Sequence, residues 1–455
     1  MNQTNRREFL SSGAKAGLGV VAGASVLHSV ARRTSAASPN EKIVLGMIGC
    51  GGRMGGLVAG FLERGDCEIA WLADCNANKF PPFVSQVEAS GQKAPQTTDD
   101  FRRILDDKAV DAIIVATPDH WHAIPTVWGC QAGKHVYVEK PASHSPWEGR
   151  KMVEAARKYN RVVQLGTQGR SAPYLIKARK YIRDGKLGKI DYVRVFNQKS
   201  WPGEKAVPDS EPPQGLDYAK WLGPAPLAPY NANHHLRWNH FWQFSGGDII
   251  NDGVHQMDIA RWLIDKDYPK TVFCNGGRYT QPCAFDSPDT QVALFDYGDM
   301  LMSFELTLNT PYMLKIDPEV RDGDLFPYWL QCATRIEIYG SEGLLMVGRH
   351  GGGWQVFARP HQRQPVVAAQ EFGRFPDKVH KEDFVDAIRN NRRPNADIEE
   401  GHRSTLLCQL ANISLRLGSV KLDFDPKSET CRGNEQANAM LKREYREPWI
   451  IRDNV

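Results

Sequence analysis

Short apolar runs alternate with longer amphipathic segments over the first third of the chain. Residues 42–48, 68–73, 109–116 and 135–138 are rich in aliphatic side chains and have the length of buried strands. The segments between them space their apolar residues as helices do, up to Leu62 and Ala132. This alternation predicts an α/β fold with a doubly wound parallel sheet, whose ligands bind at the carboxyl ends of its strands.

The first predicted strand leads into a glycine-rich turn, Gly49-Cys50-Gly51-Gly52-Arg53-Met54. Glycines let the backbone turn sharply and approach a pyrophosphate, which binds to free N–H groups at the start of the next helix. The second strand ends in Asp74, at the distance of about 20 residues where a carboxylate accepts a ribose 2′-hydroxyl. Because Met54 replaces the third small residue of the fingerprint, we expect a small change in helix packing or phosphate register.

Asp74 indicates NAD in preference to NADP, because a 2′-phosphate would meet a like charge. Arg53 has two interpretations: either its side chain contacts an adenosine phosphate, or it is a solvated arginine of the loop. Two further motifs follow predicted strands, Thr117-Pro118-Asp119-His120-Trp121-His122 and Glu139-Lys140-Pro141. A lysine at such a strand end can polarise a substrate hydroxyl or take part in proton transfer. The alternative interpretation is that Lys140 is an ordinary lysine on a surface loop.

These motifs, with Ala132-Gly133-Lys134-His135, resemble the family of glucose-fructose oxidoreductase, inositol dehydrogenase and MocA (Gfo/Idh/MocA). The resemblance continues over nearly the whole mature chain, through residues 246–258, 339–343 and 383–389. It implies a Rossmann domain for NAD(P) over residues 40–163 and a C-terminal α/β domain over residues 164–455. That second domain would have an open, mainly antiparallel sheet, often an interface of dimers or tetramers, with helices of residues 375–455 packing back on the core.

The resemblance also implies oxidation of a secondary alcohol on a sugar or polyol. Lys140 would contact the reacting hydroxyl and the nicotinamide ribose, and His255 would be the second catalytic group. The expected cofactor contacts are Gly49, Gly51, Gly52, Arg53, Met54, Asp74, Thr117, Pro118, His120, Trp121, His122, Glu139 and Lys140.

The helix expected to begin near Asn251 carries Asn251, His255, Asp258 and Trp262 on one face. Many relatives have aspartate four residues before the histidine, whereas this chain has Asn251 there and Asp252 one step later. Since asparagine cannot take a proton, proton abstraction would fall to His255 or Lys140, with Asp252 tuning the imidazole. The alternative is that His255 and Asp258 pair in the core.

Residues 230–244 are dense in aromatic and basic side chains, which suit the apolar faces and hydroxyls of sugar rings. The predicted substrate contacts are His234, His235, Arg237, Trp238, Trp242 and, from the later helix, Asp258. A metal site is disfavoured because these histidines lack a paired acidic or cysteine motif. Residues 311–329 could cap the site or form a surface loop. Residues 380–417 predict two helices broken at Arg393-Pro394, and residues 437–449 a third.

The N-terminus has the order of a signal peptide. Asn5-Arg6-Arg7-Glu8-Phe9-Leu10 precedes a weakly apolar stretch over residues 14–30, and small residues follow at Ser35, Ala36 and Ala37. Residues 1–37 are therefore interpreted as a twin-arginine signal that directs export to the periplasm or another extracytoplasmic space. The apolar run is shorter than the roughly 20 residues that span a bilayer, so no membrane anchor is expected after its removal.

Composition narrows the class of partner. A net charge of +4 over 455 residues gives no indication of nucleic-acid binding. The nine cysteines have no metal-type spacing, and we interpret them as buried thiols rather than a disulfide framework. The expected partner is a small carbohydrate.

Export constrains the chemistry, because little free NAD exists outside the cytoplasm. We therefore expect a tightly bound NAD that is recycled within each catalytic cycle. One cycle oxidises one sugar and reduces another. A second oxidises a glycoside at C3, eliminates the C1 group, then hydrates and reduces the product, which amounts to glycoside hydrolysis. A third possibility is a sugar-binding relative that has lost its chemistry.

Overall fold

The structure, a computed structural model, describes residues 42–201, 203–280, 283–315 and 317–455. The twin-arginine signal expected at residues 1–37 lies outside the described residues. Among the helices that are described, none is long and apolar enough to cross a membrane.

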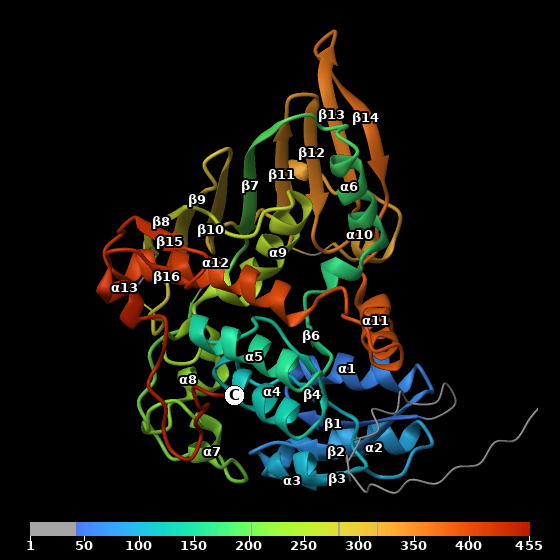
Figure 1. The fold of residues 1–455 in the computed structure, drawn as a ribbon, viewed down its shortest axis with the longest axis vertical. Coiled ribbons are helices and arrows are strands. Elements are labelled where there is room, and N and C mark those ends of the chain that lie inside the picture. The colour runs from blue at the N-terminus through green and yellow to red at the C-terminus, as the bar shows by residue number, and fades with distance from the viewer. Residues whose placement is uncertain (1–41, 202, 281–282, 316) are drawn as a thin grey trace, which may run out of the picture. The chain divides into compact units, whose positions relative to one another are not determined.

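A six-stranded, wholly parallel sheet forms the first domain, in the order β3-β2-β1-β4-β5-β6 (Figure 1). The strand order reverses between β1 and β4, which is where a doubly wound sheet opens a crevice for a ligand. The strands are β1 Ile43–Ile48, β2 Cys67–Ala73, β3 Gln96–Thr98, β4 Ala112–Val115, β5 His135–Val138 and β6 Val163–Leu165. The helices are α1 Gly52–Leu62, α2 Phe80–Ala89, α3 Arg102–Asp106, α4 Ala123–Gln131 and α5 Pro146–Lys158. The predicted doubly wound fold is confirmed.

A ten-stranded sheet forms the second domain, in the order β14-β13-β12-β11-β7-β10-β9-β8-β15-β16. Its neighbouring strands are antiparallel except for β7 and β10, so the predicted mainly antiparallel sheet is also confirmed. The strands are β7 Ile190–Gln198, β8 Thr271–Gly277, β9 Thr290–Asp296, β10 Leu301–Thr307, β11 Arg335–Gly340, β12 Gly343–Gly348, β13 Trp354–His361, β14 Gln364–Glu371, β15 Leu422–Asp425 and β16 Thr430–Cys431.

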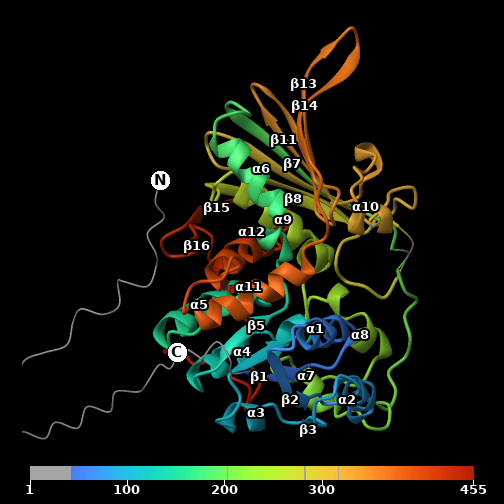
Figure 2. The same cartoon turned by 90° about the vertical axis from the view of Figure 1, so that its right-hand side faces the viewer.

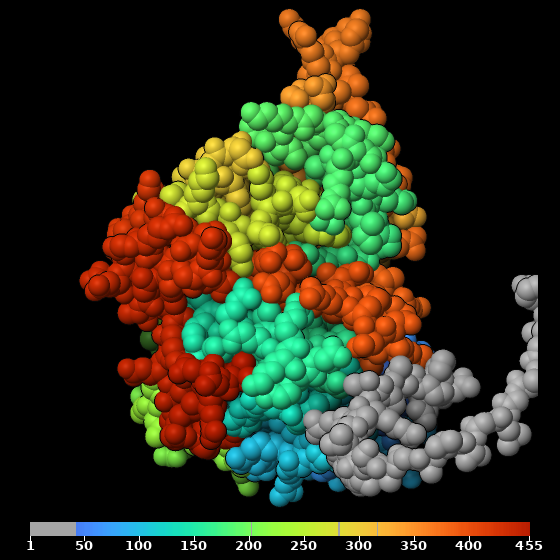
Figure 3. Space-filling model, in the orientation of Figure 1, coloured from blue at the N-terminus to red at the C-terminus, as the bar shows by residue number. Residues whose placement is uncertain are grey.

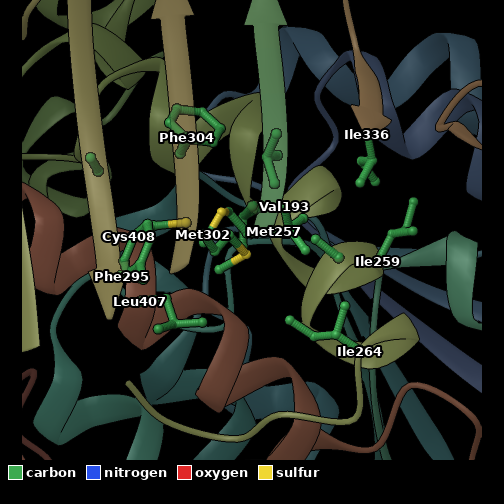
Figure 4. Packing of buried hydrophobic residues seen from close by; sticks show 14 of the residues in the cluster. Val193, Met257, Ile259, Ile264, Phe295, Met302, Phe304, Ile336, Leu407 and Cys408 are labelled. Carbon is green, nitrogen blue, oxygen red and sulfur yellow. The ribbon is translucent and has the colours of Figure 1, made fainter. Parts of the chain in front are cut away.

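One face of this sheet is covered by helices, and the core lies between them (Figures 1, 2 and 4). On β10, Met302, Phe304 and Leu306 point into this core, while Glu305, between Phe304 and Leu306, lies on the other face and forms a bidentate ion pair with Arg194 at 2.9 and 3.0 Å. This alternation follows from the two-residue period of a strand. Helices α6, α9 and α12 contact the strands of this sheet. The helices of the second domain are α6 Pro173–Arg183, α7 Tyr218–Leu222, α8 Ala232–Leu236, α9 Val254–Leu263, α10 Pro318–Asp322, α11 Asp377–Arg389, α12 Ile398–Arg416 and α13 Glu435–Ala439.

Helix α12 joins the two domains, because it packs against β8 on one side and α5 on the other (Figures 1 and 2). Helices α11 and α12 confirm the two helices predicted around Arg393-Pro394. The prediction of a third helix over residues 437–449 is wrong, since α13 ends at Ala439 and the rest of the tail is irregular. The tail instead lies against the first domain (Figure 3). Arg443 donates to Glu148 at 2.8 Å and to the carbonyl of His120 at 2.6 Å.

All nine cysteines are free thiols, and six of them are buried. The prediction that the chain has no disulfide framework therefore agrees with the structure, although Cys75, Cys283 and Cys332 are only partly buried.

A buried ion cluster fixes α9 against its surroundings. Arg170 donates through Nε to both carboxylate oxygens of Asp258 at 2.9 Å, and the hydroxyl of Ser404 donates to the same carboxylate at 2.6 Å. Glu400 lies 3.1 Å from Nη1 of Arg170. Removing one member of such a pair leaves a buried charge without its partner, which is costly.

We expect Asp258→Asn to lower the free energy of unfolding by about 3 to 5 kcal/mol, because Arg170 would lose its buried counter-charge. Urea unfolding followed by circular dichroism measures this. The matched control is Asp265→Asn, whose carboxylate pairs with Arg179 and Arg183 but is 56% exposed, and which should cost no more than about 1 kcal/mol. Equal unfolding midpoints for the two variants would contradict this account.

Candidate active site

A cavity of about 670 Å³ lies between the carboxyl ends of the parallel strands and the start of α9. Both domains contribute to its walls. The residues predicted from sequence that line it are Gly49, Gly51, Gly52, Arg53, Asp74, Thr117, Pro118, Trp121, Glu139, Lys140, His235, Trp238, Asn251 and His255.

The glycine turn forms the floor of this cavity. Gly49 has φ +89°, and a Cβ there would lie 2.8 Å from the amide nitrogen of Thr117, so only glycine fits. A Cβ on Gly51 or Gly52 would meet nothing within 4 Å, which means that the backbone borders open space. Helix α1 begins without a side-chain cap and without an acidic residue in its first turn. The residues therefore fit the pyrophosphate of NAD, which binds to N–H groups at such a helix start.

Asp74 ties the turn to β2. Its carboxylate accepts from the backbone N–H groups of Cys50 at 2.7 Å and Asn76 at 2.8 Å. Burial raises the pKa of Asp74, while these hydrogen bonds oppose that shift. A carboxylate accepts more than two hydrogen bonds, so the group can also receive a ribose hydroxyl.

Two residues expected at the cofactor are directed elsewhere. Arg53 borders the cavity, but its guanidinium pairs with Glu139 at 2.7 Å and Asp377 at 2.8 Å, rather than extending toward an adenosine phosphate. Met54 belongs to α1, is fully buried in the core of the first domain and does not line the cavity.

The histidines of the Thr117–His122 motif support the loop from behind. The two ring nitrogens of His122 lie 2.6 and 3.0 Å from the carbonyl oxygens of Pro141 and Thr117. Nε2 of His120 lies 3.0 Å from the carbonyl of Trp221, and burial lowers its pKa well below the ordinary value. Both rings are buried and neither lines the cavity, so their part is to position Thr117, Pro118 and Trp121.

Lys140, Asn251 and His255 meet at the opposite end of the cavity from Asp74. The ammonium of Lys140 donates to the backbone carbonyl of Asn251 at 2.6 Å and to its side-chain oxygen at 3.1 Å. Asn251 lies in a π-helical turn, Ile249–Gly253, and His255 follows in the first turn of α9. The predicted helix thus begins as a wide turn that brings its asparagine to the lysine.

Asp252 points away from this group. Its carboxylate lies 2.7 Å from both Lys315 and Arg349 and 3.0 Å from Lys199. Burial alone would raise the pKa of Asp252, but these three cations hold it well below the ordinary value. Asp252 is therefore a permanent counter-ion and is not suited to accept a proton.

His255 is neutral at physiological pH. Burial lowers its pKa well below 6.5, and the positive charges of Arg349 and Lys140 lower it further. A neutral imidazole beside a fixed ammonium can accept a proton from a hydroxyl that the ammonium polarises.

Residues 43–167 match a family of oxidoreductases with an NAD-binding Rossmann fold. The model of its C-terminal α/β domain covers residues 177–279 and 351–451. This chain belongs to the Gfo/Idh/MocA oxidoreductase family. Its first domain is accordingly an NAD-binding domain, and the protein is an oxidoreductase.

Individual relatives in the family are distant. The scyllo-inositol 2-dehydrogenase (NAD(+)) of Bacillus subtilis is 23% identical over 65% of this chain and 73% of its own. A glycosyl hydrolase family 109 protein of Solibacter usitatus is 30% identical over 32% of this chain and 34% of its own. The structure of the WlbA dehydrogenase of Bordetella pertussis, in complex with NADH and UDP-GlcNAcA, has a TM-score of 0.60 at 21% identity and covers 85% of this chain and 99% of its own. That likeness confirms the fold.

Only part of the predicted substrate set reaches the cavity of this family member. His235 and Trp238 line it. The other four do not: Arg237 pairs with Glu204 at 2.7 Å, His234 packs on Phe241, Trp242 lies under Arg416, and Asp258 belongs to the buried cluster with Arg170. The suggestion that His255 and Asp258 pair with each other is also replaced by that cluster.

Several wall residues were missed from the sequence, because they are distant along the chain and lie in no recognised motif. They are Lys79, Phe101, Gln168, Arg349, Phe375 and Trp449. The described residues contain no group of three or more histidine, cysteine or acidic side chains arranged to hold a metal ion.

We expect kcat/KM to stay constant as the pH falls through about 6.5, because the pKa of His255 lies well below that value. Arg349→Met should move the acidic limb upward, since removing a nearby positive charge favours the protonated imidazole. Steady-state rates from pH 4.5 to 8 test this, with Arg374→Met, a 64% exposed arginine, as the control. A wild-type limb near 6.5 that Arg349→Met leaves in place would argue against the assignment.

Proposed function

We propose that this protein is exported by the twin-arginine route and oxidises a secondary hydroxyl of a sugar, polyol or glycoside with a retained, internally recycled NAD. The observation that carries the proposal is the contact of Lys140 with Asn251 beside His255, in the same cavity as the glycine turn. Two comparisons support this class of substrate. One relative is a dehydrogenase of the polyol scyllo-inositol, and the WlbA dehydrogenase structure contains the sugar nucleotide UDP-GlcNAcA.

The residues divide the reaction between them. Lys140 donates a hydrogen bond to the reacting oxygen, and Asn251 holds that ammonium in place. His255 accepts the hydroxyl proton as the carbonyl forms. When bound, NAD supplies the acceptor for the hydride that leaves the same carbon. Asn251 only orients, because an amide does not take a proton.

Lys140→Met and His255→Asn should each lower kcat/KM by about 10² to 10⁴-fold, the range of general acid–base catalysis. Turnover on a panel of sugars, polyols and glycosides measures this, and NADH fluorescence checks that cofactor binding is retained. Lys177→Met, an exposed lysine, is the matched control. If both variants turn over every accepted substrate at the wild-type rate, the catalytic assignment is wrong. A protein that binds sugars without turnover would be a non-catalytic relative.

Retention of the cofactor is supported by the C-terminal tail. Trp449 lines the cavity together with Phe101, near the end where Asp74 would bind the adenosine ribose. Its ring packs 4.8 Å from that of Trp121 and 6.2 Å from that of Phe101, centroid to centroid. Arg443 holds the tail on the first domain through Glu148 and His120, and Arg446 holds it on α7 through the carbonyl of Ala219 at 2.7 Å. An aromatic wall held in this way would slow the release of a dinucleotide.

Trp449→Ala should therefore raise the dissociation rate of NADH by about tenfold, the loss of one well-packed aromatic contact. Stopped-flow displacement of NADH, followed by its fluorescence, measures the rate. Tyr279→Ala removes an aromatic ring that is 70% exposed and serves as the control. Purified wild-type protein that carries no NAD and exchanges it as fast as Trp449→Ala would contradict the retained cofactor.

Glycoside hydrolysis is a second candidate, supported by the family 109 relative and by the need to recycle the cofactor. Transient oxidation at C3 acidifies the C2 proton, and elimination expels the C1 group. Water then adds at C1 and the hydride returns to C3, so that only water is consumed. An aryl glycoside assayed in deuterium oxide distinguishes the two cycles: aglycone release with deuterium at C2 and no net NADH favours hydrolysis, and a redox exchange between two sugars without aglycone release excludes it.

A further inference from the structure

We propose that the substrate carries a carboxylate, as a uronic or aldonic acid does, and that Arg349 binds it. This inference rests on the proposed function and adds to it a substrate class and a specificity-determining residue. It comes from Arg349, which no sequence motif singled out, and from the charges around it.

Arg349 directly follows β12 and enters the cavity from the large sheet. The residue is 8% exposed and lines the cavity together with Asn251, His255 and Gln168. One of its guanidinium nitrogens, Nη1, lies 2.7 Å from Asp252, which anchors the side chain. A guanidinium has five N–H donors in a planar fork, so an arginine anchored at one nitrogen can present others to a ligand.

The charges at this end of the cavity do not balance. Two cations, Lys140 and Arg349, line the cavity. Behind them, Lys199, Lys315 and Arg349 share two carboxylates, Asp248 and Asp252. Lys199 contacts both carboxylates, at 2.8 and 3.0 Å. Lys140 is held by the neutral oxygens of Asn251.

Neighbouring titratable groups do not remove the excess. The pKa values of His255 and His350 are lowered well below the ordinary value, chiefly by burial, so both rings are neutral. Asp119 lines the cavity and accepts from Ser245, and burial raises its pKa. With Asp119 protonated, as its raised pKa favours, Lys140, Lys199 and Arg349 face only Asp248 and Asp252, and Lys315, which is 36% exposed, adds a further positive charge. On the other side of Lys140, Arg53 and Lys381 balance Glu139 and Asp377.

An unmatched positive charge in a buried site favours an anionic ligand. Transferring charge from water into a protein is costly unless it is paired, and a ligand carboxylate would supply the missing partner. A neutral sugar would leave the imbalance in place. Arginine suits a carboxylate in particular, because its N–H groups match the two oxygens.

The test compares a uronic acid with its own methyl ester, which keeps the sugar ring and removes the charge. Full-length, NAD-loaded protein is given glucuronate, methyl glucuronate, glucose 6-phosphate and glucose, and kcat/KM is measured for each. Calorimetric titration of glucuronate into the NADH-loaded protein gives a binding readout that needs no turnover. We expect glucuronate to exceed its ester by at least about tenfold, as for a hydrogen bond between charged groups.

Arg349→Met should abolish this preference, and Arg349→Lys should restore part of it. The ratio between acid and ester is the readout, because a merely structural loss would lower both alike. Arg374→Met should keep the wild-type ratio.

Three results would overturn the inference. Equal turnover of acid and ester would show that the excess charge only keeps His255 neutral, and would leave the proposed function standing. Preference for glucose 6-phosphate, with glucuronate inactive, would assign the site to phosphate. Failure of every substrate, with no binding of glucuronate, would refute the proposed function together with this inference.

Discussion

The hydrogen bonds from Lys140 to Asn251 connect the end of one sheet to a helical turn packed on the other. Neither domain has the catalytic group alone, because Lys140 follows β5 while Asn251 and His255 precede and begin α9. The distance between the two depends on how firmly the domains are joined. Helix α12, packed against β8 and α5, fixes that relation, and the buried Arg170–Asp258 pair holds α9 to the segment that follows β6. The rest of the cavity is useful only while this contact holds.

The second constraint is the direction of two neighbouring side chains. In the π-helical turn, Asn251 faces the lysine and Asp252 faces three cations on the side of the large sheet. A carboxylate that directly contacted Lys140 would compete with His255 as a proton acceptor. Because the carboxylate lies one residue later, on Asp252, it instead holds Lys199, Lys315 and Arg349 near the neutral imidazole of His255. The division between a proton acceptor and a permanent counter-ion thus follows from local backbone geometry.

Much of the fold was predictable, because it depends on local patterns. The four predicted strands of the first domain were mostly apolar runs, while β3, which is Gln96–Thr98, has no apolar residue to mark it. The glycines at the end of β1 predicted the floor of the cavity, and Lys140 in its motif predicted one of the catalytic groups. The sugar-binding set was less predictable, since aromatic and basic residues also serve packing, as His234 and Trp242 do. Arg349 had no local signal, because its place depends on pairing with Asp252 through the fold.

Trp449 lies far along the chain from Phe101, although both line the same cavity, and this separation has a consequence for biogenesis. Domains generally fold from the N-terminus while the chain is being synthesised. The glycine turn, Asp74 and Lys140 can therefore assemble long before the ribosome has made the tail that completes the wall beside Phe101. This part of the cavity wall is therefore completed only after both sheets have been synthesised. A chain that lacks Trp449 would keep the glycine turn, Asp74 and Lys140 but not the aromatic wall beside Phe101.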